Sequence, residues 1–93
     1  MTNMDRKDRL TLMLKTIEQI RKHLSALTME ANKALPFLER SYEECFAYPD
    51  YEQKSELYSN RIIATEKRLE KYKESEIDMY SLKKRFEELL NEE

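Results

Sequence analysis

The amino-acid sequence predicts an all-α protein that folds as a long antiparallel helical hairpin, similar to a coiled coil. The 93 residues contain no Gly and only two Pro, which leaves few places for the tight turns of an all-β fold. Apolar residues recur with heptad spacing over more than five repeats. A corner at Tyr48-Pro49-Asp50 then divides the chain into two arms of similar length. We therefore expect one helical-hairpin domain over residues 1–93.

The first helix is expected over about residues 5–47. Stepping alternately by three and four residues defines the a and d columns of its heptad repeat, which we call the seam: Leu10, Met13, Ile17, Ile20, Leu24, Leu27, Ala31, Ala34, Leu38, Ser41, Cys45 and Tyr48. Thr2, Asn3 and Asp5 are candidate N-caps. The repeat predicts that both columns pack against the second helix.

Pro36 falls inside this expected helix. A proline in a helix interior removes one hydrogen bond and clashes with the preceding turn, at a cost of about 3 kcal/mol. The helix therefore either kinks or breaks near Pro36. A kink is favoured, because Leu35 is a poor N-cap for a new helix and the heptad keeps its phase across the proline.

The second helix is expected over about residues 51–90, after a corner at residues 48–50. From Tyr51 its seam runs through Ser55, Tyr58, Ile62, Thr65, Leu69 and Tyr72. The same phase then meets Glu76 and Lys83, whereas Leu82 and Leu89 lie off it. This irregularity at residues 75–81 indicates a register shift or a break, and one continuous helix is favoured. In a hairpin that turns near Pro49, the numbers of facing residues add up to about 98.

Apolar side chains outnumber the places in one seam, which predicts a protein partner. A two-helix hairpin of this size is marginal alone, and three apolar positions in seven suit a bundle. A homodimer that forms a four-helix bundle is the simplest solution, and a heteromeric complex is the alternative. The function is then that of a protein-interaction module: an adaptor, an assembly subunit, or a chaperone-like or inhibitory partner. The candidate interface residues are Leu14, Leu35, Phe37, Tyr42, Phe46, Tyr48, Leu57, Ile63, Ile77 and Tyr80.

Catalytic and metal-binding patterns are missing from the sequence. His23 is the only histidine and Cys45 the only cysteine, so a zinc site has too few ligands. The residue three before His23 is Ile20, which excludes the Glu-x-x-His pattern of di-iron bundles. A chain without Gly has no Gly-rich phosphate loop. We expect no enzymatic activity, no metal, no cofactor and no small-molecule substrate.

The charge pattern favours a solvated protein surface over a nucleic-acid site. The net charge is −2, and acidic neighbours dilute the basic clusters at residues 67–73 and 83–85. A regulatory nucleic-acid-associated protein that uses this Lys/Arg stripe is the alternative. No apolar run approaches the roughly 20 residues of a membrane span, and the polar start Met1–Arg9 does not resemble a secretory signal. A cytoplasmic location is therefore expected.

Overall fold

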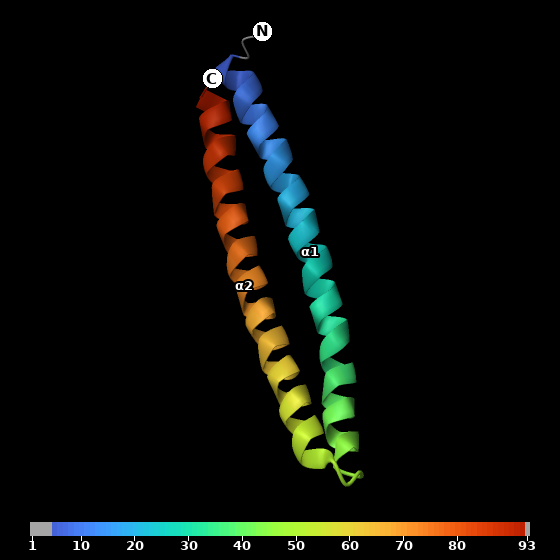
Figure 1. Ribbon diagram of the computed structural model, residues 1–93. Coiled ribbons are helices and arrows are strands. Elements are labelled where there is room, and N and C mark those ends of the chain that lie inside the picture. Colours follow the sequence, from blue (N-terminus) through green and yellow to red (C-terminus); the bar gives the residue numbers. More distant parts are fainter. Residues whose placement is uncertain (1–4, 93) are drawn as a thin grey trace.

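The computed structural model describes residues 5–92, which form two long helices, α1 (Arg6–Cys45) and α2 (Tyr51–Glu92), and no strand. The helices lie side by side and antiparallel, with the corner at one end and the start of α1 beside the end of α2 at the other (Figure 1). The molecule is a thin plate that measures 67 × 27 × 15 Å. The predicted all-α helical hairpin is confirmed.

Asp5 caps the start of α1. Its Oδ1 accepts a hydrogen bond of 2.9 Å from the backbone N–H of Asp8, one of the amides that a helix start leaves without a partner. Thr2 and Asn3, the other candidate caps, lie outside the described residues, as does the first part of the polar start Met1–Arg9. Asp5 therefore fixes where the hairpin begins.

α1 continues through Pro36 as one helix of 40 residues. The break that the sequence left open does not occur. Pro36 lies on the exposed surface of the helix, so its ring does not disturb the contact with α2. Pro36 still lowers the stability of the helix, because it has no backbone N–H and one intrahelical hydrogen bond is missing.

The chain reverses direction over residues 46–50, a corner slightly longer than the one predicted. The backbone N–H groups of Ala47 and Tyr48 donate to the carbonyls of Glu44 and Cys45, at 3.1 and 3.2 Å. The ring of Phe46 lies 5.3 Å from that of Tyr42, edge to face, and 5.6 Å from that of Tyr51. These aromatic contacts join the end of α1 to the start of α2.

The face that α1 turns towards α2 differs from the predicted one. The a column is buried, as for Leu10 at 5% and Ile17 at 6% exposure. The d column lies nearer the edge of the contact: Met13, at 39%, and Ile20, at 41%, are exposed, as are Ala34 and Tyr48, so their predicted place under α2 is wrong, whereas Leu27 and Ser41 are half-buried. The e column takes that place: Leu14, Arg21, Thr28, Leu35 and Tyr42 are all half-buried.

Polar contacts account for this choice of face. In the e column, Arg21 donates to Glu18 at 2.7 Å, and the hydroxyl of Thr28 donates to the carbonyl of Leu24 at 2.8 Å. Both polar side chains can therefore sit at the contact without losing hydrogen bonds. A helix in a two-helix pair covers only about two columns, so placing e inside moves d to the edge.

α2 keeps one phase from the corner to its end, and the irregularity at residues 75–81 does not interrupt the helix. From Ser55 onwards the residues of that phase are buried or half-buried, including Glu76 and Lys83, whereas Leu82 is exposed. The Nζ of Lys83 lies 3.3 Å from Oε1 of Glu18 on α1, which compensates its inward position. The pairing of residues 18 and 83 also lies close to the predicted register.

Candidate protein-interaction surface

An apolar hollow lies between the helices near the open end of the hairpin. It has a volume of about 370 Å³ and is lined by Leu12, Met13, Thr16, Ile17 and Ile20 of α1 and by Met79, Leu82 and Phe86 of α2. Thr16 is the one lining residue with a polar side chain, and its hydroxyl already donates to the carbonyl of Leu12 at 2.9 Å. The hollow therefore presents almost only hydrocarbon to the solvent.

Further hollows continue this one towards the corner on the same side of the hairpin. The next is lined by Leu27, Glu30, Ala31, Ala34, Thr65, Arg68 and Tyr72, and the one at the corner by Ser41, Glu44, Cys45, Tyr48, Lys54 and Tyr58. The α1 d column lines all of them in turn, and residues seven apart lie on one side of a helix. We call this side of the plate the groove face. It is apolar near the open end and carries cations from α2 near the corner.

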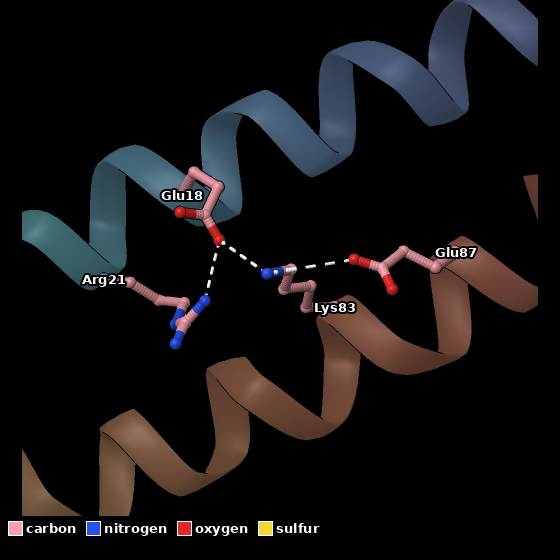
Figure 2. Close-up of polar contacts among 4 residues, drawn as sticks. All are labelled: Glu18, Arg21, Lys83 and Glu87. Carbon is pink, nitrogen blue, oxygen red and sulfur yellow. Dashed lines mark hydrogen bonds and ion pairs between the residues drawn. The ribbon is translucent and has the colours of Figure 1, made fainter.

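The opposite face is polar at the corresponding height. A hollow there is lined by Glu18, Arg21, Lys22, Ser25 and Glu76. Figure 2 shows the carboxylate of Glu18 between Arg21 and Lys83, with Lys83 also 3.8 Å from Oε1 of Glu87. The hydrogen bond from Arg21, and secondly the one from Lys83, lowers the pKa of Glu18 below its ordinary value of 4.5. These charges satisfy one another within the chain.

Tyr80 lies beside this ion cluster on the opposite face. The guanidinium carbon of Arg21 is 5.7 Å from the centre of its ring, and the Nζ of Lys84 is 5.1 Å from it. Cations at this distance are attracted to the face of an aromatic ring. Tyr80 therefore has neighbours within the chain, although 47% of its surface is exposed.

The structure does not gather the ten candidate interface residues into one patch. Leu14, Leu35 and Tyr42 are half-buried in the e column against α2. The exposed residues divide between the faces by helical spacing: Phe37, Tyr48 and Leu57 on the groove face, and Phe46, Ile63, Ile77 and Tyr80 on the opposite face. Phe37 is the most exposed of them, at 71%.

Sequence reasoning missed the exposed apolar residues of the hollow. The heptad spacing places Met13 and Ile20 in the seam of the first helix, and it leaves Leu82 off the phase of the second. All are exposed on the groove face. The sequence did contain a signal for them: the first helix has three apolar columns, a, d and e, whereas one neighbouring helix covers about two. The sequence did not show which of these three columns would be left exposed.

Cys45 and His23, the remaining residues with reactive side chains, do not form a site together. Cys45 is a buried free thiol whose Sγ lies 2.9 Å from the carbonyl oxygen of Tyr42, and His23 is exposed. Among the residues that the structure describes, no group of at least three His, Cys, Asp or Glu side chains could hold a metal ion. Within the same residues, neither helix combines the length and apolar character that crossing a membrane requires.

Comparisons of the chain with protein-family models, with curated proteins and with solved structures give no match.

Proposed function

We propose that this protein is a protein-interaction module that binds a helical partner on its groove face rather than catalysing a reaction. One observation carries the proposal: α1 half-buries a column that contains polar side chains and leaves large apolar side chains of the competing column exposed. The half-buried e column contains Arg21 and Thr28, whereas Met13 and Ile20, in the d column near the open end, are exposed. A contiguous exposed apolar patch is typical of a surface that another protein covers.

The small buried core of the hairpin supports the proposal that a partner supplies a further layer of helices. Among the described residues only Leu10, Ile17, Cys45 and Thr65 are more than nine-tenths buried, which is a small core for a chain of 93 residues. Full burial of a side chain such as Ile20 or Leu82 stabilises by about 1.5–3 kcal/mol. A helix laid in the groove would bury several such side chains at once. An adaptor or assembly subunit that works by helix packing fits this surface.

Two further parts of the proposal follow from single residues. The protein would act in the cytoplasm, since Cys45 is a buried free thiol and the fold does not depend on an oxidising compartment. Protein binding is preferred to nucleic-acid binding, because Lys83 is paired with carboxylates and Lys84 lies over Tyr80. Duplex DNA in a mobility-shift assay at low salt is expected to remain unbound; salt-sensitive binding would favour the nucleic-acid alternative.

Paired variants test the protein-binding proposal. In Ile20→Glu/Leu82→Glu two charges enter the groove face, and in Ile63→Glu/Ile77→Glu the same charges enter the opposite face. Light scattering after size exclusion measures self-association, and immobilised protein incubated with an extract of the native host measures binding of other proteins. Circular dichroism checks that each variant keeps its helices.

We expect the wild type and the Ile63→Glu/Ile77→Glu variant to self-associate or to retain a specific protein. The Ile20→Glu/Leu82→Glu variant should do neither, because charged side chains in an apolar contact lose hydration without gaining partners. Equal behaviour of the two variants would contradict the proposal. So would a wild type that stays monomeric and retains nothing.

A further inference from the structure

We infer that the partner on the groove face is a second copy of this chain, with the two-fold axis parallel to the long axis of the hairpin. In this arrangement the groove faces meet, α1 of each copy packs over α2 of the other, and the two open ends lie together. The result is a four-helix bundle whose neighbouring helices are all antiparallel. The inference rests on the proposed function, in that it names the partner of the proposed surface.

The internal register shows which residues would meet. The ion pair of Glu18 with Lys83 places these residues at one height along the hairpin. A two-fold axis along the hairpin preserves height, so residues level with each other on α1 and α2 of one copy face each other across the two copies. Seven-residue steps extend this register along both helices.

The outer edges of the two groove faces complement each other in charge. Each helix has one column of residues at the outer edge of its groove face. On α1 this column is Arg9, Thr16, His23, Glu30, Phe37 and Glu44. On α2 the residues at the same heights, in the same order, are Glu92, Arg85, Asp78, Lys71, Ala64 and Leu57. All of these side chains are exposed. Arg9 meets Glu92 and Glu30 meets Lys71, and no level pair in these columns brings like charges together.

Size is also complementary at one position of the same edges. Phe37, at 71% exposure, lies level with Ala64. An exposed ring on one copy would therefore sit over the smallest side chain of the facing column on the other. An aromatic side chain that enters such a gap is the usual anchor of an interface.

At the centre of the contact, apolar side chains of one copy face apolar side chains of the other, and small side chains face long ones. Near the open end, Met13 and Ile20 would pack on Leu82 and Leu89 of the second copy. Nearer the corner, the small side chains of Ala34 and Ser41 lie level with the long, exposed cations Arg68 and Arg61. Arginine stems can cover such small residues while their charged ends reach Glu30 and Glu44 at the edge.

The opposite, reversed arrangement of two copies lacks this agreement. With the two-fold axis across the hairpin, the corner half of each groove face would lie on the open half of the other. Arg61, Arg68 and Lys54 would then be placed on the apolar hollow around Ile20 and Leu82. Burying unpaired cations against hydrocarbon is costly, which selects the arrangement with the open ends together.

Thiol cross-linking tests the geometry directly. Phe37→Cys protein is mixed with Ala64→Cys protein, or with Thr16→Cys protein, and treated with a short bis-maleimide. The inferred dimer predicts a two-chain product from the Phe37→Cys and Ala64→Cys mixture only, since Thr16 would lie near Phe37 only in the reversed arrangement. Wild-type protein, whose Cys45 is buried, is the control and should form no product.

A charge exchange provides a second readout. Glu30→Lys should weaken the dimer about tenfold in Kd by placing like charges level with each other, and addition of Lys71→Glu in the same chain should restore it. Cross-linking through Thr16→Cys, or no rescue by the second substitution, would overturn the inference. A monomeric wild type that captures another protein through Ile20 and Leu82 would overturn the inference while leaving the proposed function standing. A groove face that binds nothing at all would remove both.

Discussion

Glu18 shows how single residues make the observed packing feasible. Its carboxylate accepts a hydrogen bond from Arg21 at 2.7 Å and lies 3.3 Å from Lys83, so it joins polar positions of α1 and α2 that face the contact (Figure 2). The side chains are 31–45% exposed, so each pair contributes little by itself. Their effect is to remove the penalty of polar groups at the contact, which lets the e column of α1 face inwards.

The lowered pKa of Glu18 predicts part of the acid sensitivity of the fold. A carboxyl whose folded pKa lies below the ordinary 4.5 stabilises the fold above that pH, and this contribution is lost as the pH falls through the lowered value. Glu18→Gln should therefore lose less unfolding free energy than the wild type as the pH falls below 4.5. Urea unfolding at a series of pH values, followed by circular dichroism, measures this difference.

A matched control for this measurement is Glu39→Gln, which removes an exposed carboxylate for which residues 5–92 provide no ion pair. Its acid dependence should follow that of the wild type. The assignment to Glu18 would be wrong if Glu18→Gln and the wild type had the same dependence on pH.

The cap at Asp5 predicts a second effect of one residue. Asp5→Ala removes the acceptor for the Asp8 amide and should lower the unfolding free energy by about 1 kcal/mol. Asp5→Asn keeps an acceptor oxygen and should remain close to the wild type. Denaturant unfolding of the three proteins gives the comparison, and a loss in the asparagine variant equal to that in the alanine variant would contradict the capping role.

For the two helices, sequence patterns within each helix predicted where the helix lies better than which of its faces is buried. The heptad spacing, the Pro49 corner and the cap at Asp5 are local, and they gave the fold class, the arms and a register close to the observed one. The choice between the d and e columns depends on contacts between distant residues, such as that of Glu18 with Lys83. If only the number of apolar residues is considered, Leu82 is expected to face α1. Because α2 continues in one phase, Lys83 faces α1 instead and Leu82 is exposed. The groove face was therefore beyond what periodicity alone could predict.

Pro36 predicts a change in the stability of α1. Pro36→Ala restores an amide that can donate to the carbonyl of Asn32 and removes the clash of the ring with the preceding turn. Because Pro36 is exposed, no contact with α2 is lost, and the unfolding free energy should rise by up to about 3 kcal/mol. Thermal unfolding measured by circular dichroism tests this, and a lower midpoint in the variant would contradict the expected gain in stability.

At the scale of the whole molecule, the hairpin is a plate with two unlike faces. One face holds the ion cluster around Glu18, where polar groups find partners within the chain. The other holds the groove, where Met13, Ile20 and Leu82 remain exposed. The Cα atoms of the plate span 15 Å across its thin side, which is one layer of helices, and the proposed partner would supply the second layer.

A dimer makes stability depend on concentration. We expect the midpoint of thermal unfolding to rise with protein concentration in the wild type, since association stabilises the folded chain by mass action. The Ile20→Glu/Leu82→Glu variant should unfold at a lower midpoint that does not change with concentration. Scanning calorimetry over a hundredfold range of concentration measures both, and a wild-type midpoint independent of concentration would argue against self-association.

Small-angle X-ray scattering of the wild-type protein measures the mass and the length of the particle together, and a dimer through the groove face fixes both. We expect the mass of two chains of 11.3 kDa in a particle no longer than one hairpin, whose Cα atoms span 67 Å. The doubled mass would show that a second copy binds, and the unchanged length that the two hairpins overlap along their whole length. A particle of one chain's mass at every concentration, or a dimer clearly longer than one hairpin, would contradict this expectation.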